Sequence, residues 1–202
     1  MTGDPAILFD IGNVLFCDPW ETLFLSPQKG LADSRGLDRQ VVERIGRELW
    51  YEFSTRESGE CSYWREVEKR LDIRISPADI TQLEEQLLFP NPHAETILQK
   101  ASDTGRSIGI ASNNTSFWFA KQRTALSLDR YVDPKLVFLS HVLGVEKGAV
   151  GQGLIEIAAA QVDVPASFFV DDRESNLDRA QNVGFTVIRY SMTDRTPIPS
   201  FS

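Results

Sequence analysis

The sequence has few of the side chains that hold transition metals or build disulfide frameworks. Its 202 residues include only two histidines, His93 and His141, and two cysteines, Cys17 and Cys61. Two imidazoles are too few for a zinc site built on several histidines, and they argue against a catalytic triad based on histidine. Two cysteines are too few for a disulfide framework and are typical of a reducing compartment. Any bound metal is therefore expected to be held mainly by oxygen atoms.

Long apolar runs and an excess of positive charge are also absent. No stretch approaches the roughly 18 apolar residues that a membrane span requires, and the first apolar run meets Asp10 too soon for a signal peptide. The 21 lysines and arginines are outnumbered by 29 aspartates and glutamates, which gives a net charge of −8. Because an acidic protein repels phosphate backbones, we expect no nucleic-acid partner. The lack of an apolar span and of a signal peptide predicts no membrane association and a cytoplasmic location.

What is present is the composition of an ordinary globular protein, with 42% hydrophobic and 25% charged residues. Short apolar runs predict buried strands at residues 6–10, 107–111 and 167–170, with weaker candidates at 136–139 and 185–189. Helical patterns follow at residues 154–162 and 176–183. This alternation predicts a doubly wound, Rossmann-like α/β fold with a parallel sheet, in which sites form at the carboxyl ends of the strands.

One long segment interrupts the alternation. Residues 17–89 contain no convincing strand but several amphipathic patterns, including residues 39–53 and 63–71, that are typical of helices. The sequence therefore predicts a helical unit, residues 17–89, inserted into a core formed by residues 1–16 and 90–202. Aromatic residues are frequent in this unit, and they fit either the packing of small helices or stacking against a ligand ring.

Acidic residues follow two of the predicted strands at the point where each strand ends. Asp10 follows the first strand, and Asp171 and Asp172 follow the strand at residues 167–170. A carboxylate in the position of Asp10 suits a nucleophile or a metal ligand, although a single acidic residue after a strand is also a common turn cap. Adjacent carboxylates repel each other unless a cation or hydrogen-bond donors compensate, which favours Mg²⁺ bound by Asp10 and one of the pair.

Ser112, Asn113 and Lys147 offer the groups that a phosphorylated ligand would need. Ser112 and Asn113 end the second strand, where hydroxyl, amide and backbone donors suit phosphoryl oxygens, or where Ser112 simply caps a helix. The ammonium of Lys147 would offset the repulsion between an anionic carboxylate and an anionic ester.

In this order and at these strand ends, the residues resemble the haloacid dehalogenase superfamily, most of whose members are phosphatases and phosphotransferases. The resemblance covers essentially the whole chain. Residues 7–14 resemble the first motif of the family, residues 108–113 the second and Lys147 the third. The most specific match is the fourth motif, which comprises residues 168–172 with Asn176, Ala180 and Gly184.

The resemblance implies a covalent mechanism and a magnesium site. Asp10 would attack phosphorus while Ser112, Asn113 and the catalytic Lys147 hold the phosphoryl group, and water would then hydrolyse the aspartyl phosphate. The inserted helices resemble the C1 cap of the family. The implied function is magnesium-dependent hydrolysis of a small phosphorylated metabolite, with a sugar phosphate favoured by the Asp-Ile-Gly-Asn-Val motif at residues 10–14.

The resemblance also implies which atoms hold the metal. Mg²⁺ would be bound by Asp10, by the backbone carbonyl of Gly12 and by Asp172, with Asp171 as an auxiliary or indirect ligand. Glycine keeps the carbonyl oxygen that the family uses at this position, so the metal site does not depend on a side chain there.

Gly12 is nevertheless a departure, because many phosphatases of the family place there an aspartate that protonates the leaving oxygen. Asp18, farther along the chain, is a candidate substitute. Two alternatives follow from the missing acid: a non-catalytic or very slow phosphate-binding regulatory protein, and a dehalogenase, which uses an attacking aspartate but no magnesium. A second departure is the glycine-rich segment after Lys147, where relatives commonly have proline and an acidic residue.

Overall fold

The computed structural model describes residues 3–194 and 197–201 and contains one sheet of five parallel strands. The strands lie in the order β3-β2-β1-β4-β5 and comprise β1 (Ala6–Phe9), β2 (Ser107–Ser112), β3 (Val137–Leu139), β4 (Phe168–Asp171) and β5 (Thr186–Arg189). The chain builds β1, β2 and β3 towards one edge and then crosses to β4 and β5. The predicted doubly wound α/β fold is therefore confirmed, and the strand order reverses between β1 and β4.

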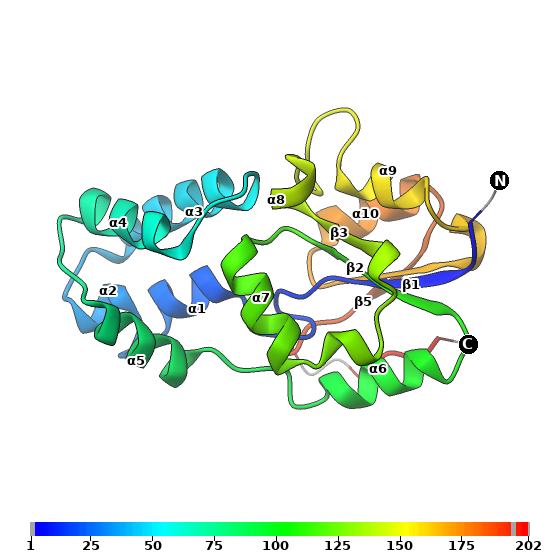
Figure 1. Cartoon of the computed structure of the whole chain (residues 1–202), viewed down its shortest axis with the longest axis horizontal. Coiled ribbons are helices and arrows are strands. Elements are labelled where there is room, and N and C mark those ends of the chain that lie inside the picture. Colours follow the sequence, from blue (N-terminus) through cyan, green and yellow to red (C-terminus); the bar gives the residue numbers. More distant parts are fainter. Residues whose placement is uncertain (1–2, 195–196, 202) are drawn as a thin grey trace.

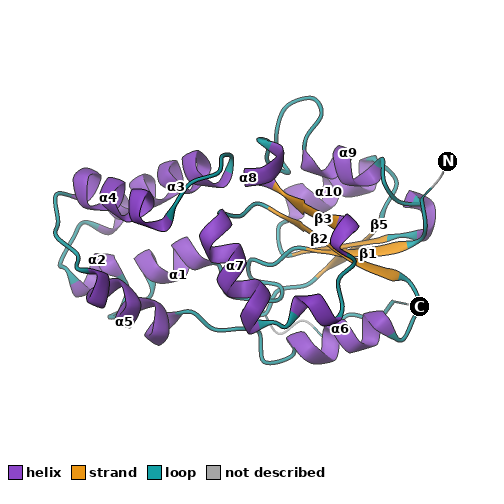
Figure 2. Ribbon diagram, viewed as in Figure 1, coloured by secondary structure: helices purple, strands orange, loops and turns teal. Residues whose placement is uncertain are grey.

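Helices cover both faces of the sheet, because the side chains of each strand point alternately to the two sides. Ile7 and Phe9 pack on the side of α6 (Ala94–Ser102). Leu8 packs on the opposite side, against α9 (Leu154–Ala159) and α10 (Glu174–Asn182). Figure 2 shows the resulting three layers, with α6 below the strands and α9 and α10 above them. The remaining elements of this part are α7 (Ser116–Ala125), α8 (Ser140–Leu143) and three 3₁₀ turns at Leu128–Arg130, Pro134–Leu136 and Val164–Ala166.

A second group of helices lies beyond the carboxyl ends of the strands, on the left of Figure 1. It comprises α1 (Pro19–Leu25), α2 (Leu31–Ser34), α3 (Arg39–Ser54), α4 (Glu60–Leu71) and α5 (Pro77–Leu87). The five helices share one hydrophobic cluster, separate from the two clusters on the faces of the sheet. We propose that this group is the inserted unit expected at residues 17–89.

The two segments that connect this group to the sheet lie side by side. The backbone nitrogen of Cys17 donates to the carbonyl of Phe89 at 3.1 Å, and that of Asn91 donates to the carbonyl of Leu15 at 3.0 Å. The chain therefore leaves the sheet and returns to it through one hydrogen-bonded pair of segments. Both cysteines are free thiols, and among the described residues no helix combines the length and apolar character needed to cross a bilayer.

Trp118 joins α7 to the hydrophobic cluster of the helical group. Its side chain is fully buried, stacks on Trp50 with a centroid distance of 5.7 Å, and meets the ring of Tyr63 edge to face at 5.0 Å. Its indole nitrogen donates to Glu84 of α5 at 2.9 Å. This one residue thus ties three helices of the group to a helix that follows β2.

We expect Trp118→Ala to lower the free energy of unfolding by about 3–5 kcal/mol, because it leaves a large cavity between the two parts of the chain. Phe89→Ala is the matched control: its side chain is 49% exposed, so its loss should change stability by less than ~0.5 kcal/mol. Urea unfolding, followed by the far-ultraviolet circular dichroism of the helices and not by tryptophan fluorescence, measures both free energies of unfolding. A loss below ~1 kcal/mol for Trp118→Ala would show that the helical group does not depend on this contact.

Candidate active site

The reversal of strand order brings the acidic residues of two different motifs together. Because β1 and β4 are neighbours, Asp10 at the end of β1 lies beside Asp171 and Asp172 at the end of β4. The backbone nitrogen of Asp10 donates to the carbonyl of Val170 at 2.9 Å and continues the strand pairing to the edge of the sheet. One ligand oxygen from each of the three carboxylates lies within 4.8 Å of the others.

Lys147 is the cation that holds two of these carboxylates in place. Its Nζ lies 2.7 Å from Oδ2 of Asp10 and 2.7 Å from Oδ2 of Asp171, and the residue is only 1% exposed. Burial by itself lowers the pKa of Lys147, but the charges of Asp10 and Asp171 outweigh it and raise that pKa, so the ammonium stays charged. Burial raises the pKa of Asp10, and Lys147 offsets part of that rise.

Asp171 is saturated by hydrogen bonds that fix the lysine. Its Oδ1 accepts from the backbone nitrogen of Arg173 at 2.9 Å, and both of its oxygens accept from Nδ2 of Asn176 at 3.0 and 3.1 Å. With Lys147 added, each carboxylate oxygen has at least two partners. Asp171 is therefore placed to orient Lys147, and it has little capacity left for direct metal ligation.

Asp172 is in the opposite situation. Its Oδ1 is buried and has no hydrogen-bond partner among the described residues, and its Oδ2 accepts only a long bond of 3.4 Å from Nδ2 of Asn13. Burial, together with the charges of Asp10 and Asp171, raises the pKa of Asp172 to about 7. A buried carboxylate oxygen without a donor is costly, and a hard divalent cation is a ligand that would satisfy it. The carboxylates of Asp10 and Asp172 therefore form a donor set that would fit Mg²⁺, and Gly12 lines the same cavity as Asp10.

Ser112 and Asn113 end up with different partners. Ser112 is fully buried at the end of β2, and its hydroxyl is one of the groups whose hydrogen bond lowers the pKa of Asp10. The side chain of Asn113 is used to anchor the lysine, since its Oδ1 accepts from the backbone nitrogen of Lys147 at 2.9 Å. Although a glycine-rich segment follows Lys147, the backbone of this lysine is thus held by Asn113, the residue directly after β2.

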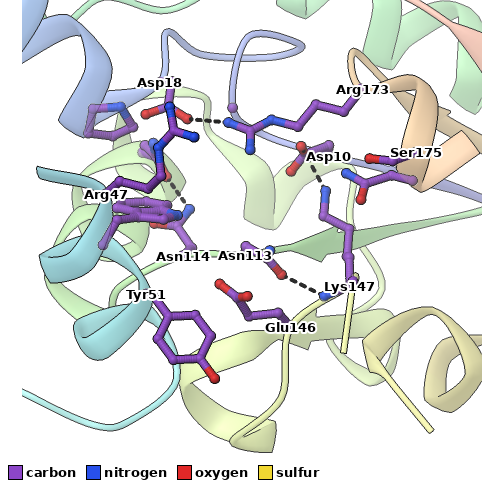
Figure 3. A pocket seen from close by; sticks show the side chains of 16 residues that line it. Asp10, Asp18, Arg47, Tyr51, Asn113, Asn114, Glu146, Lys147, Arg173 and Ser175 are labelled. Carbon is purple, nitrogen blue, oxygen red and sulfur yellow. Dashed lines mark hydrogen bonds and ion pairs between the residues drawn. The ribbon is translucent and has the colours of Figure 1, made fainter. Parts of the chain in front are cut away.

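One cavity of about 280 Å³ is lined by Asp10, Gly12, Asn113 and Lys147, and Figure 3 shows it from close by. Ser112, Asp171 and Asp172 adjoin these residues but are not part of the lining. The floor of the cavity carries Asp10 and Lys147, and its wall on the side of the helical group carries Arg47, Trp50 and Tyr51 of α3. These three residues stand at positions i, i+3 and i+4 of one helix and therefore share a face. Trp50 is also part of the cluster of the helical group, whereas Tyr51 is largely exposed.

Three charged residues of the cavity were not predicted from the sequence: Arg47, Glu146 and Arg173. Glu146 and Arg173 are chain neighbours of the predicted Lys147 and Asp172, and that proximity is the signal that could have identified them. Arg47 carries no such signal, because it belongs to a helix whose orientation only the fold reveals. Burial raises the pKa of Glu146, which also accepts a bond of 3.4 Å from the hydroxyl of Ser54 on α3.

Comparisons with known proteins identify this fold. No protein-family model matches the chain, and no curated protein is detectably similar in sequence. A magnesium complex of a HAD family enzyme from Bacteroides thetaiotaomicron superposes with a TM-score of 0.70 at 16% identity, covering 96% of both chains. A HAD phosphatase from Thermococcus onnurineus gives 0.57 at 22% identity, over 92% of this chain and 85% of that one. An L-2-haloacid dehalogenase from Xanthobacter autotrophicus gives 0.56 at 19%, over 92% and 77%.

The similarity is one of fold, and it confirms at that level the resemblance seen in the motifs. The neighbours include both a phosphatase and a dehalogenase, so the shared architecture does not choose between the two reactions. The choice has to come from the residues of the cavity.

Proposed function

We propose that this chain, which has the fold of the haloacid dehalogenase superfamily, is a magnesium-dependent phosphomonoester hydrolase that acts on a small phosphorylated metabolite through an aspartyl phosphate. The observation that carries the proposal is the pairing of Lys147 with Asp10 and Asp171, both at 2.7 Å, beside the partnerless Oδ1 of Asp172. This arrangement offers a fixed nucleophile, a buried cation for phosphoryl oxygens and a carboxylate oxygen that needs a cation.

Each step of the proposed reaction has a residue that would carry it out. A carboxylate oxygen of Asp10 attacks phosphorus in line with the ester oxygen, and the P–O bond to the alcohol breaks as the new bond to Asp10 forms. Lys147 and Ser112 hold equatorial phosphoryl oxygens. The side-chain oxygen of Asn113 keeps the lysine in place by accepting from the backbone nitrogen of Lys147. Water then attacks phosphorus, which releases inorganic phosphate and regenerates Asp10.

Magnesium fits the same residues. Asp10, Asp172 and the backbone carbonyl of Gly12 would hold the ion, with Asp171 contributing indirectly through Lys147. When bound, Mg²⁺ would screen the repulsion between the carboxylate nucleophile and the phosphate dianion. A magnesium and inorganic phosphate complex of the Bacteroides enzyme, similar in fold with a TM-score of 0.66, is consistent with this assignment.

The cavity also narrows the class of substrate. Its volume of about 280 Å³ suits a small molecule, and its walls combine an indole, a phenol and charged groups from Arg47, Glu146 and Arg173. Hydroxyl groups on a compact ring could use these polar groups while the ring contacts Trp50, so a sugar phosphate remains favoured. The cytoplasmic location expected from the sequence stays a prediction.

A dehalogenase is the second candidate, because such enzymes are among the structural neighbours and need no acid at position 12. The buried, partnerless Oδ1 of Asp172 favours the phosphatase, since a dehalogenase has no use for a metal ligand there. A non-catalytic phosphate-binding protein would keep the same cation but would not turn over.

Phosphate release by the purified chain tests the proposal. With Mg²⁺ and a panel of sugar phosphates, polyol phosphates and aryl phosphates, we expect turnover that excess EDTA abolishes and added Mg²⁺ restores. Activity on 2-haloacids that survives EDTA would support the dehalogenase instead. Binding of inorganic phosphate without release of phosphate from any ester would support the non-catalytic protein.

Asp172→Ala isolates the metal site. We expect the affinity for Mg²⁺, measured by isothermal titration calorimetry in the absence of substrate, to fall at least about 10-fold, because the partnerless carboxylate oxygen is removed. Asp178→Ala, which removes an exposed carboxylate of α10, is the control and should bind Mg²⁺ like the wild type. Equal affinities for the two variants would mean that Asp172 is not a ligand.

A further inference from the structure

Asp18 places a second buried carboxyl at the cavity, on the side of the helical group. It is the residue before α1, and its Oδ1 accepts from the backbone nitrogen of Glu21 at 3.3 Å, as a helix cap does. Its Oδ2 lies 3.5 Å from Nη2 of Arg173, a contact that Figure 3 marks with a dashed line. The residue is only 5% exposed and lines the same cavity as Asp10.

The position of Oδ2 relates Asp18 to the gap left by Gly12. A Cβ atom added to Gly12 would lie 3.5 Å from Oδ2 of Asp18, at ordinary van der Waals distance. No other heavy atom of the described residues, apart from the immediate chain neighbours, comes within 4 Å of that Cβ. An acidic side chain at position 12 would therefore extend into the space that the carboxyl of Asp18 already reaches.

The hydrogen bonds of Asp18 are weak for a buried carboxylate. Its two oxygens have contacts of 3.3 and 3.5 Å, whereas Asp171 accepts bonds of 2.7 to 3.1 Å. A buried carboxylate with such poor partners gains little from being charged, so its surroundings favour the protonated form.

Three charged groups face Asp18 from different elements. Glu21 lies on its own helix, Asp10 follows β1 and Arg173 follows β4. Burial and the charge of Glu21 raise the pKa of Asp18, Arg173 lowers it, and the net result is about 7. A carboxyl with this value is present in both protonation states near neutrality, which a group that gives and takes a proton within one cycle requires.

We propose that Asp18 is the general acid and base of this site and takes the place of the aspartate missing at Gly12. The inference rests on the proposed phosphatase function. In the first step the carboxyl of Asp18 gives its proton to the ester oxygen as the P–O bond breaks and Asp10 becomes phosphorylated. The alcohol then leaves. In the second step the Asp18 carboxylate accepts a proton from the water that attacks phosphorus, the bond between phosphorus and Asp10 breaks, inorganic phosphate leaves, and Asp18 is protonated again.

Asp18→Asn separates this role from helix capping. The amide oxygen of asparagine can still accept from the backbone nitrogen of Glu21, so α1 keeps its cap, but the amide cannot exchange a proton. Asp38→Asn is the matched control, because Asp38 caps α3 in the same way, accepting from the backbone nitrogens of Gln40 and Val41, but does not line the cavity. If Asp18 only caps the helix, the two variants should behave alike.

The experiment follows the phosphorylated enzyme as well as turnover. The full chain with Mg²⁺ is mixed with 4-nitrophenyl phosphate, which has a good leaving group, or with glycerol phosphate, which has a poor one. The reaction is quenched, and intact-protein mass spectrometry gives the mass of the protein. For Asp18→Asn we expect steady-state turnover of both esters to fall by about 10²- to 10⁴-fold. With 4-nitrophenyl phosphate alone, this variant should release about one equivalent of nitrophenol and accumulate protein heavier by one phosphoryl group, because dephosphorylation lacks its base.

A double variant makes the spatial argument testable. Gly12→Asp in the Asp18→Asn background should restore turnover of glycerol phosphate, because the new side chain reaches the space of the lost carboxyl. If Asp18→Asn turns over both esters as fast as the wild type and Asp38→Asn, and accumulates no phosphorylated protein, the role of Asp18 is overturned while the proposed function stands. A wild-type protein that never becomes phosphorylated and releases no phosphate from either ester would overturn the proposed function and this role with it.

Discussion

Asp10→Asn is expected to abolish phosphate release, with a loss of about 10⁴-fold or more, and to leave no covalent intermediate. The amide that replaces the nucleophilic oxygen cannot form a stable acyl phosphate. The fold should persist, because Lys147 keeps Asp171 as a carboxylate partner and the hydrogen bond that continues β1 comes from the backbone. Phosphate release and intact mass after quenching measure the two effects.

The control for this substitution is Asp163→Asn, which changes a carboxylate at the opposite end of the sheet, before β4. It should retain wild-type turnover and circular dichroism. If Asp10→Asn releases phosphate at a comparable rate, the nucleophile lies elsewhere, and the assignment of Asp10 is wrong even though the cavity contains a phosphatase.

Lys147→Met is expected to lower the free energy of unfolding by about 3–5 kcal/mol. The substitution leaves Asp10 and Asp171 buried without the cation that contacts both of them at 2.7 Å. Methionine keeps much of the aliphatic volume, so the loss reports the charge more than a cavity. Turnover should also disappear, because the nucleophile then faces a phosphate dianion without a neighbouring ammonium.

Lys121 offers a matched control, because it also bridges two carboxylates, Glu60 at 2.7 Å and Glu84 at 2.6 Å, but is 41% exposed. Lys121→Met should cost ~1 kcal/mol or less, since water screens an exposed ion pair. Adding Asp171→Asn to Lys147→Met should recover part of the lost stability by removing one of the unpaired charges. Equal losses for the two lysine variants in urea unfolding would contradict a buried, charge-compensating role for Lys147.

The residues at strand ends were accessible from the sequence because each follows a short apolar run. Parallel strands meet at one edge of the sheet, so Asp10, Ser112 and the pair Asp171 and Asp172 could be expected to converge before the strand order was known. The strand order then added what the sequence did not contain, namely that β1 and β4 are direct neighbours. The different surroundings of Asp171, which is saturated with hydrogen bonds, and Asp172, which has a partnerless oxygen, also became visible only in the structure.

Other parts of the cavity depend on how the helical group sits over the sheet. The face that presents Arg47, Trp50 and Tyr51 is one of several on an amphipathic helix, and hydrophobic periodicity cannot say which side looks towards a ligand. Trp118 follows β2 in the chain, yet it packs in the cluster of the helical group. The contact of Asn113 with phosphate stays a prediction, and the structure adds that its side-chain oxygen anchors Lys147.

The most direct test of the central claim identifies the residue that carries the phosphoryl group. The wild-type protein is mixed with Mg²⁺ and an ester that it hydrolyses, quenched in acid and reduced with borohydride, which converts an aspartyl phosphate into homoserine. Peptide mass spectrometry of residues 6–14 should then show homoserine at position 10. Continued turnover with Asp10 unmodified, or homoserine at another aspartate, would contradict the mechanism.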